Sequence, residues 1–216
     1  TDWLAEWKRY WKPSVIGNFV IAAPWHEVDG PDKIVIRIEP NMAFGTGTHE
    51  TTQLCLAAIE EHLQPADSFL DVGTGTGILA IAAAMKSKVQ SLRSKGDALD
   101  FRPWTVDSAL AIDNDPDSIK IAKENAELND VSNIEFQIAT LAAKTPHFDF
   151  VCANLTLDVI LPILSMLLER ADRILVLSGI LVDQENEIVR ALKENGYESA
   201  EISGAGEWIA LTIRKS

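Results

Sequence analysis

The sequence lacks long hydrophobic runs and an opening signal segment. Its apolar runs, of which Ile78–Met85 is an example, fall far short of the roughly 18–20 residues that a membrane-spanning helix needs. The first residues, TDWLAEW, do not show the charged-then-apolar order of a secretory signal. We therefore expect no membrane association and a soluble, cytoplasmic protein.

Cysteine is scarce. Only Cys55 and Cys152 occur, and no Cys-x-x-Cys pair or Cys/His cluster surrounds them. This pattern excludes the common structural zinc motifs, so we expect no metal site. Two isolated cysteines are typical of reduced, mostly buried thiols.

Positive charge is also scarce. The 216 residues carry 19 Lys and Arg against 32 Asp and Glu, a net charge of −13, and basic residues are concentrated only in Lys86–Lys95. The field of such a chain repels nucleic acid, so we expect no direct nucleic-acid binding. It attracts a basic protein or a cationic small molecule. Acidity that only keeps the protein in solution is the alternative explanation.

From Asp67 onward, short apolar runs alternate with amphipathic segments, a pattern typical of a parallel α/β sheet. The predicted strands are 68–72, 108–113, 133–138, 148–154 and 173–179, followed by a hairpin of 197–203 and 207–215 joined by Gly204–Gly206. The predicted helices are 78–85, a segment that begins at Pro116, 157–169 and 182–195. We therefore expect a mostly parallel sheet that carries an antiparallel strand at its end.

Two helices have recognisable ends. Asp115 before Pro116 combines an N-cap acid with proline at the first helical position. Gly196 suits a left-handed cap at the end of another helix. The helix after Pro116 carries apolar residues on the side that we expect to face the sheet, namely Ile119, Ala122, Ala126 and Leu128.

The chain before Asp67 has a different pattern. Residues 19–25 and 33–39 read as short strands separated by a turn-rich stretch. Aromatic residues at helical spacing (Trp3, Trp7, Tyr10 and Trp11) predict an amphipathic helix whose stripe packs on the domain or, alternatively, forms an exposed docking face. Residues 86–107 interrupt the α/β rhythm and are interpreted as an inserted surface excursion.

A glycine-rich loop, LDVGTGTG, follows the strand at 68–72 and opens the next helix. Gly73 permits a tight turn, Gly75 lets a ligand approach the backbone, and Gly77 lets helix and strand pack closely. The spacing differs from the Gly-x-Gly-x-x-Gly loop that binds pyrophosphate, and Asp71 lies within the strand end. The loop therefore suits a ligand without phosphate, whose adenosine and amino-acid ends lie across it.

An acid at the end of the next strand fits this ligand. Asp113 ends the strand at 108–113, where a carboxylate can accept hydrogen bonds from both ribose hydroxyls. The expected spacing from the glycines is about twenty residues, and the insertion accounts for the longer distance here. Asp113 could instead cap the following helix, but Asp115 is better placed for that role.

A second Gly-Thr stretch, MAFGTGTHETT, precedes this loop. Combined with DVGTGTGILAIAA, AIDNDPDSIKIAKENAELN, VCANL and LSGIL, it places the chain among sequences that resemble class I S-adenosylmethionine-dependent methyltransferases. More closely, these segments resemble the PrmA family of bacterial ribosomal protein methyltransferases, which methylate protein eleven of the large ribosomal subunit. With EWKRYWKP and GEWIAL, the resemblance covers nearly the whole chain.

The resemblance implies a Rossmann-like α/β fold with a seven-stranded, mostly parallel sheet and helices on both faces. Residues 1–48 would form an N-terminal helix, a β-hairpin and a lid loop, and residues 49–216 the methyltransferase domain. Members of the family carry a small substrate-recognition domain ahead of the segment that begins here at Asp2. This sequence lacks that domain, which leaves substrate choice open.

The resemblance also implies the site residues. S-adenosylmethionine would contact Thr52, Asp71, Gly73, Gly75, Gly77, Asp113 and Asn154, and a lid of Phe44, Gly45, Thr46 and Gly47 would cover its methionine half. Alternatively, the first Gly-Thr loop is a turn in which Thr48 or His49 caps the following helix, and Thr52 is an ordinary early-helix hydroxyl. The IATL stretch after the strand at 133–138 offers no carboxylate to adenine, so backbone atoms near Ala139 and Thr140 would serve.

The implied reaction is methyl transfer to a lysine or N-terminal amine of a basic ribosomal protein. Asn154 would be the catalytic residue, because its side-chain oxygen can accept hydrogen bonds from the incoming amine. His49 is more plausible as a loop-stabilising residue than as a base. The alternatives are another protein or small-molecule acceptor, an inactive module that binds S-adenosylmethionine or a partner, and, least favoured, an NAD-dependent oxidoreductase.

Overall fold

A computed structural model of the chain describes residues 12–28, 33–39, 47–94 and 108–215. The predicted aromatic helix around Trp3–Trp11 and the lid residues Phe44, Gly45 and Thr46 lie outside these ranges. Ten strands are labelled: β1 (Ser14–Ile16), β2 (Phe19–Ala22), β3 (Ile34–Arg37), β4 (Phe69–Val72), β5 (Ala109–Asp113), β6 (Ile134–Ile138), β7 (Phe148–Asn154), β8 (Ala171–Leu181), β9 (Glu201–Ala205) and β10 (Trp208–Arg214). The helices are α2 (Glu50–His62), α3 (Ile78–Ser94), α4 (Pro116–Leu128), α5 (Leu157–Arg170), the 3-10 turn η1 (Val182–Gln184) and α6 (Glu185–Glu194).

Seven strands form the main sheet in the order β6-β5-β4-β7-β8-β10-β9. Strands β4 to β8 pair in parallel, whereas β10 is antiparallel to both β8 and β9. The predicted fold class is therefore confirmed. The closing turn is shifted, because Gly204 and Ala205 pair with Ile209 and Trp208 within the ladder, and the chain reverses at Gly206 instead.

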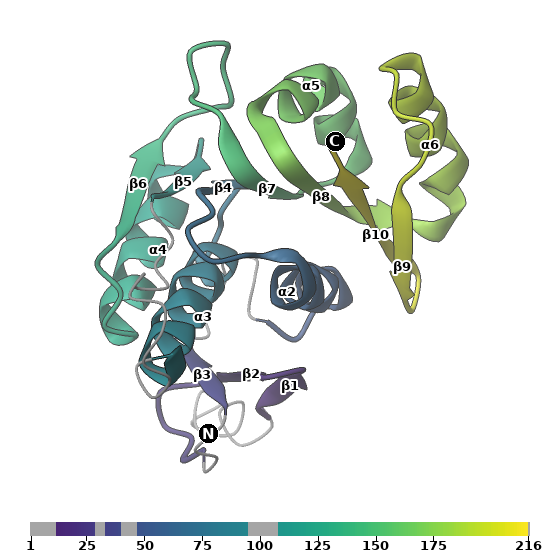
Figure 1. The fold of residues 1–216 in the computed structure, drawn as a ribbon. Helices are drawn as coiled ribbons and strands as arrows, with labels where there is room; N and C mark the ends of the chain where they lie inside the picture. The colour runs from purple at the N-terminus through teal and green to yellow at the C-terminus, as the bar shows by residue number, and fades with distance from the viewer. Residues whose placement is uncertain (1–11, 29–32, 40–46, 95–107, 216) are drawn as a thin grey trace.

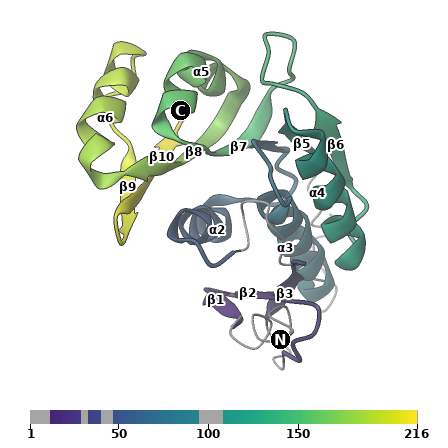
Figure 2. The ribbon, with the colours of Figure 1, turned by 180° about the vertical axis from the view of Figure 1, so that it is seen from behind.

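Helices cover both faces of this sheet (Figures 1 and 2), with α2, α3 and α4 on one face and α5 and α6 on the other. Each face has its own buried apolar core. The core on the α2 and α3 side includes the stacked rings of Phe69 and Phe150, whose centroids are 5.3 Å apart. Both cysteines are fully buried in this core, as the sequence predicts.

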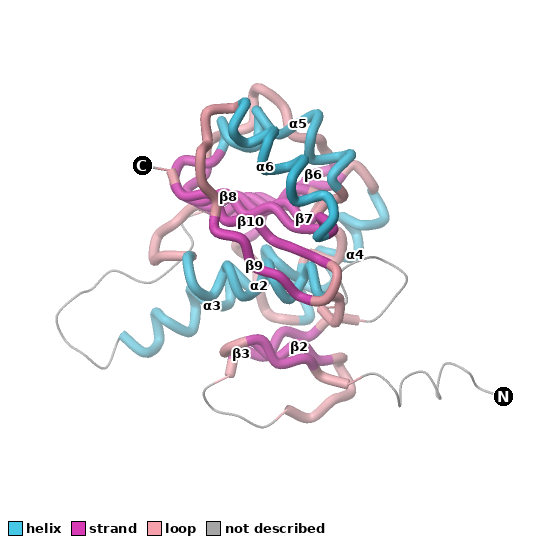
Figure 3. The backbone as a smooth tube through the Cα atoms, turned by 90° about the vertical axis from the view of Figure 1, so that its right-hand side faces the viewer, coloured by secondary structure: helices cyan, strands magenta, loops and turns pink. Residues whose placement is uncertain are grey.

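A small three-stranded sheet, β1-β2-β3, packs beyond α2 and α3 as an outer layer (Figure 3). Its buried side chains Phe19, Ile21 and Ile36 join the same core as the main sheet. The expected hairpin between residues 19–25 and 33–39 is wrong; the hairpin of this sheet joins β2 to β1, a strand that was not predicted. The two strands that were read from the sequence, β2 and β3, run parallel.

Helix α3 is longer than predicted and extends to Ser94 instead of ending near Met85. The predicted surface excursion therefore begins as helix, and its first residue is not at the surface. Lys86 is buried, and its ammonium donates to the carbonyls of Ile59, Glu60 and Leu63 at 3.0, 2.6 and 2.9 Å. These carbonyls belong to the end of α2, where the last carbonyl groups of a helix lack intrahelical partners.

The predicted helix ends agree with the structure. The Asp115 side chain accepts from the backbone N–H groups of Asp117 and Ser118, with Pro116 in the first turn of α4. These hydrogen bonds lower the pKa of Asp115. Gly196 adopts a φ of 86° after α6. Among the described residues, no helix has both the length and the apolar character needed to cross a membrane.

Candidate functional site

Three neighbouring strands bring the predicted site residues to one edge of the main sheet. Val72, the last residue of β4, pairs with Ile112 of β5 and with Ala153 of β7. Asp113 and Asn154 follow those partners directly, so they flank the turn that begins at Gly73. The sheet order reverses beside β4, and such a switch point at the carboxyl ends of parallel strands is where open α/β sheets bind ligands.

The glycine loop, Gly73–Gly77, is shaped by left-handed backbone conformations. Gly73, Gly75 and Gly77 have φ values of 75°, 54° and 81°, which side-chain-bearing residues rarely adopt. A Cβ atom on Gly77 would lie 2.9 Å from Cβ of Ala122 on α4, so this glycine permits close packing of the loop on the helix. The sequence predicted that Gly77 lets helix and strand pack closely; the close contact that the structure shows is instead with α4.

Asp71 is fully buried beneath this loop. Its Oδ2 atom accepts a hydrogen bond from the Thr74 hydroxyl at 2.7 Å, whereas its Oδ1 atom is buried without a partner. Burial raises the pKa of Asp71 to about 7, the hydrogen bond from Thr74 and the backbone N–H of Ala80 oppose this shift, and the nearby charge of Asp113 adds to it. The Ala80 N–H therefore lies close to the carboxyl group, although its geometry falls short of a hydrogen bond to Oδ1. A buried carboxyl group therefore titrates near neutral pH under the loop.

Asp113 lies at the end of β5 and organises the loop from the other side. Its Oδ2 atom accepts from the Gly75 N–H, and its Oδ1 atom accepts from the Asp115 N–H, both at 3.0 Å. Each carboxylate oxygen can accept more than one hydrogen bond, so both retain acceptor capacity. Asp115, rather than Asp113, caps α4. The carboxylate of Asp113 remains available to a ligand.

Asn154 ends β7, and its Oδ1 atom is buried without a hydrogen-bond partner. The turn after it is held close to β8, because the Leu155 N–H donates to the Ser178 carbonyl at 3.0 Å. Gly179, with a φ of 85°, makes this approach possible, since a Cβ atom there would lie 2.4 Å from the Leu155 carbonyl oxygen. The Leu155 side chain meanwhile lies against Gly73, where a Cβ atom would meet it at 2.4 Å.

The residues from Gly47 to Thr52 form the described part of the first Gly-Thr stretch. His49 caps α2, because its Nδ1 atom accepts from the Thr51 N–H at 3.3 Å, and its ring contacts that of Trp208 edge-on. The loop-stabilising interpretation of His49 is thus the one that the geometry favours. Thr52 is 1% exposed, yet its hydroxyl oxygen has no partner.

Three buried oxygens around the glycine loop are therefore unsatisfied: Thr52 Oγ1, Asp71 Oδ1 and Asn154 Oδ1. A buried polar atom without a partner costs about 1–3 kcal/mol, so proteins rarely retain one without a reason. These three atoms come from α2, β4 and β7, and β4 and β7 pair side by side where the glycine loop begins. These three oxygens can accept hydrogen bonds from ammonium, hydroxyl and amine groups. S-adenosylmethionine and an acceptor amine together present such groups.

The model of the family described as "Ribosomal protein L11 methyltransferase (PrmA)" matches residues 1–216. The chain belongs to the ribosomal protein L11 methyltransferase family. A relative named ribosomal protein L11 methyltransferase from Caldicellulosiruptor bescii is 36% identical over 219 residues, which cover 100% of this chain and 66% of that protein. Another, from Desulforapulum autotrophicum, is 39% identical over 217 residues, which cover 97% of this chain and 66% of that protein. The chain thus spans just under two thirds of the length of these relatives.

The structural comparison agrees with this family. A ribosomal protein L11 methylase from Lactobacillus delbrueckii subsp. bulgaricus superposes with a TM-score of 0.79 at 32% identity, covering 95% of this chain and 100% of that one. A magnesium protoporphyrin IX methyltransferase from Synechocystis with bound S-adenosylmethionine superposes with a TM-score of 0.52 at 19% identity, over 74% of this chain and 76% of that one. The second comparison supports the methyltransferase fold only.

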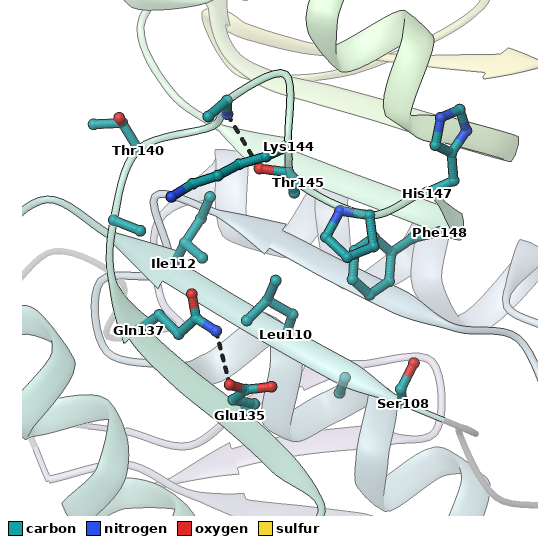
Figure 4. A pocket seen from close by; sticks show the side chains of 14 residues that line it. Ser108, Leu110, Ile112, Glu135, Gln137, Thr140, Lys144, Thr145, His147 and Phe148 are labelled. Carbon is teal, nitrogen blue, oxygen red and sulfur yellow. Dashed lines mark hydrogen bonds between the residues drawn. The ribbon is translucent and has the colours of Figure 1, made fainter.

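On the face of the main sheet that carries α5 and α6, no helix among the described residues covers the strands β5 and β6. Residues 139–147 connect β6 to β7 as a loop, and a pocket of about 460 Å³ lies between that loop and the strands β5 and β6 (Figure 4). Leu110, Ile112 and Phe148 form its apolar part, and Lys144 extends across it. Ala139 and Thr140, predicted to lie near adenine, line one end.

A group of possible metal ligands lies away from the glycine loop. Glu61, His62 and Glu201 place ligand atoms within 4.8 Å of one another. Glu201 already accepts from Arg214 at 2.9 Å, and burial lowers the pKa of His62. Glu201 therefore already has a cationic partner within the chain.

Sequence reading missed two features of the site. It placed Leu128 on the inner side of α4, but Leu128 is 39% exposed, and Asn125, 1% exposed, lies buried in its stead. A search for apolar residues at helical spacing does not select a polar residue such as Asn125. Its position three residues after Ala122 could still have indicated that it lies on the buried side of the helix. It also gave no role to Gly179, whose packing against Leu155 depends on a contact between strands that only the fold creates.

Proposed function

We propose that the chain is an S-adenosylmethionine-dependent methyltransferase that modifies lysine or N-terminal amines of a ribosomal protein. The substrate class follows from its relatives, which are named for ribosomal protein L11. A net charge of −13 favours association with a basic protein of this kind. A ribosomal substrate would place the activity in the cytoplasm.

The observation that carries the proposal is the set of three unsatisfied oxygens, on Thr52, Asp71 and Asn154, around the glycine loop. They coincide with positions that the family resemblance assigns to the ligand. In this structure a ligand is excluded from each atom just as bulk water is, so a bound molecule can satisfy them only when the side chains that cover them shift.

The binding residues follow from this arrangement. Asp113 would accept hydrogen bonds from the ribose hydroxyls, and Gly73, Gly75 and Gly77 would let the ligand approach the backbone. Thr52 and Gly47 would face the methionine half, together with Phe44, Gly45 and Thr46 from outside the described residues. When bound, S-adenosylmethionine supplies a methyl group on a positively charged sulfur.

The remaining task of the protein is to orient the acceptor amine. Asn154 Oδ1 would accept one N–H of that amine and direct its lone pair inward, which makes Asn154 the proposed catalytic residue. Holding a lysine neutral at pH 7 costs roughly 4.6 kcal/mol from its reference pKa of about 10.4. A partly buried pocket beside the positively charged sulfur of S-adenosylmethionine would lower this cost, because both burial and that charge disfavour the ammonium form. His49 has no proton-transfer role here, since its ring caps α2.

The test is methyl transfer from S-adenosylmethionine to purified ribosomal protein L11, followed by mass spectrometry of the substrate. We expect the wild-type chain to add methyl groups and Asn154→Ala to be slower by about 100-fold, because a misplaced acceptor reacts poorly. Asn195→Ala is a matched control, since the exposed Asn195 amide donates only to the Ala191 carbonyl of its own helix, at 2.8 Å.

Different outcomes separate the alternatives. If L11 remains unmodified while another protein or a small molecule is methylated, the acceptor class is wrong. If S-adenosylmethionine binds and nothing is methylated, the inactive binding module is favoured. If Asn154→Ala and Asn195→Ala behave alike, Asn154 has no part in the reaction.

A further inference from the structure

Helix α4 contacts the glycine loop through a buried amide that no part of the proposed reaction uses. The Asn125 Nδ2 atom donates to the Thr76 carbonyl at 2.9 Å, and its Oδ1 atom accepts from the Glu39 N–H at 3.1 Å. One partner is an acceptor and the other is a donor, so only one orientation of the amide satisfies both. One side chain thus joins two segments that are distant in sequence.

The carbonyl that Asn125 holds lies at the most permissive point of the loop. Thr76 is between Gly75 and Gly77, which have φ values of 54° and 81°. Glycines on both sides leave the peptide planes of the loop free to rotate unless something fixes them. Thr76 is fully buried, and the Ala122 packing beside Gly77 comes from the turn of α4 before Asn125. Packing and hydrogen bonding from one helix therefore fix the same part of the loop.

A second asparagine, Asn129 at the C-cap of α4, holds the end of β3. The Asn129 amide accepts from the Arg37 N–H at 2.7 Å and donates to the Arg37 carbonyl at 2.6 Å. It also donates to the Asn125 carbonyl at 2.7 Å. Asn125 and Asn129 are four residues apart, so they lie on one face of the helix. This face secures the end of β3 as well as the glycine loop.

We propose that Asn125 is a positioning residue for the glycine loop: by holding the Thr76 carbonyl and the Glu39 N–H with one buried amide, it sets the loop in the conformation that binds S-adenosylmethionine. Asn129 anchors β3 to the same helix and does not reach the loop. The inference rests on the proposed function for its ligand, but the effect on the loop itself is independent of any ligand.

Asn125→Asp is the sharpest variant. An aspartate can still accept from the Glu39 N–H, and once ionised it cannot donate to the Thr76 carbonyl; because burial favours the neutral acid, the variant is measured at a pH high enough to ionise this carboxyl group. Without ligand, hydrogen exchange of the Gly77 amide, which donates to the Thr74 carbonyl at 2.9 Å, should be at least about tenfold faster than in the wild type. The dissociation constant for S-adenosylhomocysteine, measured by calorimetry, should rise about 10- to 100-fold.

Asn129→Asp is the matched control, with the same change of chemistry four residues along the same helix. It should lower the melting temperature while leaving the Gly77 exchange rate and the dissociation constant within about twofold of the wild type. Asn125→Ala removes the same hydrogen bond without adding charge, so it repeats the test if the aspartate variant does not fold.

Three outcomes would overturn the assignment. Folded Asn125 variants with wild-type exchange at Gly77 would show that the amide does not hold the loop. Faster exchange with unchanged affinity would show that the loop conformation does not govern binding. Equal effects of Asn129→Asp and Asn125→Asp would show a general loss of stability. If the wild type itself binds no S-adenosylhomocysteine, the proposed function fails, and the exchange measurement still decides whether Asn125 positions the loop.

Discussion

The two ends of helix α2 treat their buried polar groups in opposite ways. At its start, the buried Thr52 hydroxyl has no hydrogen-bond partner, and the same holds for Asp71 Oδ1 on β4 and Asn154 Oδ1 on β7. At its end, Lys86 donates to three carbonyls, and Arg173 donates to the His62 carbonyl at 3.0 Å and forms an ion pair with Asp67. Buried polar groups thus lack hydrogen-bond partners at the start of α2, the unsatisfied end, and have several at its other end, the saturated end.

This difference separates architecture from ligand binding. A saturated group stabilises the fold whether or not a ligand is present, because its partners belong to the chain. An unsatisfied buried group costs stability until something supplies a partner. Substitutions at the saturated end should therefore lower stability and leave ligand affinity alone, and those of the unsatisfied groups should lower ligand affinity without lowering stability.

The largest effect on stability is expected for Lys86→Met. Methionine keeps an unbranched apolar chain of similar length but removes the ammonium donor from three carbonyls, of which the Ile59 carbonyl still accepts from the Leu63 N–H. We expect the free energy of unfolding to fall by about 2–4 kcal/mol in urea denaturation. Affinity for S-adenosylmethionine should stay within about twofold. Lys120→Met is the control, because the exposed Lys120 lies 4.0 Å from Glu124 and should contribute under about 0.5 kcal/mol. Weaker binding in a folded Lys86→Met chain would contradict the separation.

Asp71→Asn should change how stability depends on pH. Because burial raises the folded-state pKa of Asp71 to about 7, the folded chain keeps a proton that the unfolded chain releases near pH 4. Wild-type stability is therefore highest, as far as this group is concerned, below pH 4 and falls as the pH rises towards 7. Asparagine stays neutral and can still accept from Thr74.

The Asp71→Asn variant should match the wild type near pH 4 and exceed its free energy of unfolding at pH 8 by a few kcal/mol, since each unit of pKa shift corresponds to about 1.4 kcal/mol. Urea denaturation across this range measures the difference. Parallel curves for the two proteins would show that Asp71 is ionised when folded, and the carboxyl would then not be an unsatisfied neutral group.

The smallest effects should come from two neighbouring threonines of α2. Thr52→Val removes an unpartnered hydroxyl and should leave stability unchanged or raise it by up to about 1 kcal/mol, while affinity for S-adenosylmethionine falls about 3- to 10-fold. Thr51→Val removes a hydroxyl that lies 2.9 Å from His49 Nδ1, so it should cost about 1 kcal/mol with little change in affinity. Thermal denaturation with and without ligand distinguishes the two. A loss of stability in Thr52→Val would mean that its hydroxyl has a partner in the chain.

Much of the main sheet could be predicted from sequence because its signals are local. Strands such as Phe148–Asn154 are short apolar runs, and Asp115-Pro116 marks a helix start by side-chain chemistry alone. The Gly73–Gly77 loop carries its own spacing. The placement of Asp113 and Asn154 beside that loop then follows, because the carboxyl ends of adjacent parallel strands meet at one edge.

What could not be predicted depends on contacts between distant segments. Lys86 reads as the start of a polar surface stretch, and only the position of α2 makes it a buried cap. Asn125 is polar and therefore absent from an apolar pattern, although Thr76 and Glu39 bury it. The parallel pairing of β2 and β3 likewise arises from their common packing on α2 and α3, which no local signal encodes.

The most direct test of the central claim is calorimetric titration of S-adenosylmethionine into this chain and into Asp113→Ala. The wild type should bind S-adenosylmethionine and not NAD. The variant should bind about 100-fold more weakly or more, because two hydrogen bonds to a charged group are lost. Asp117→Ala, which removes an exposed acid from the first turn of α4, should bind like the wild type. No binding to the wild-type chain, or equal binding by the Asp113 and Asp117 variants, would contradict the assignment of the site around the glycine loop to this ligand.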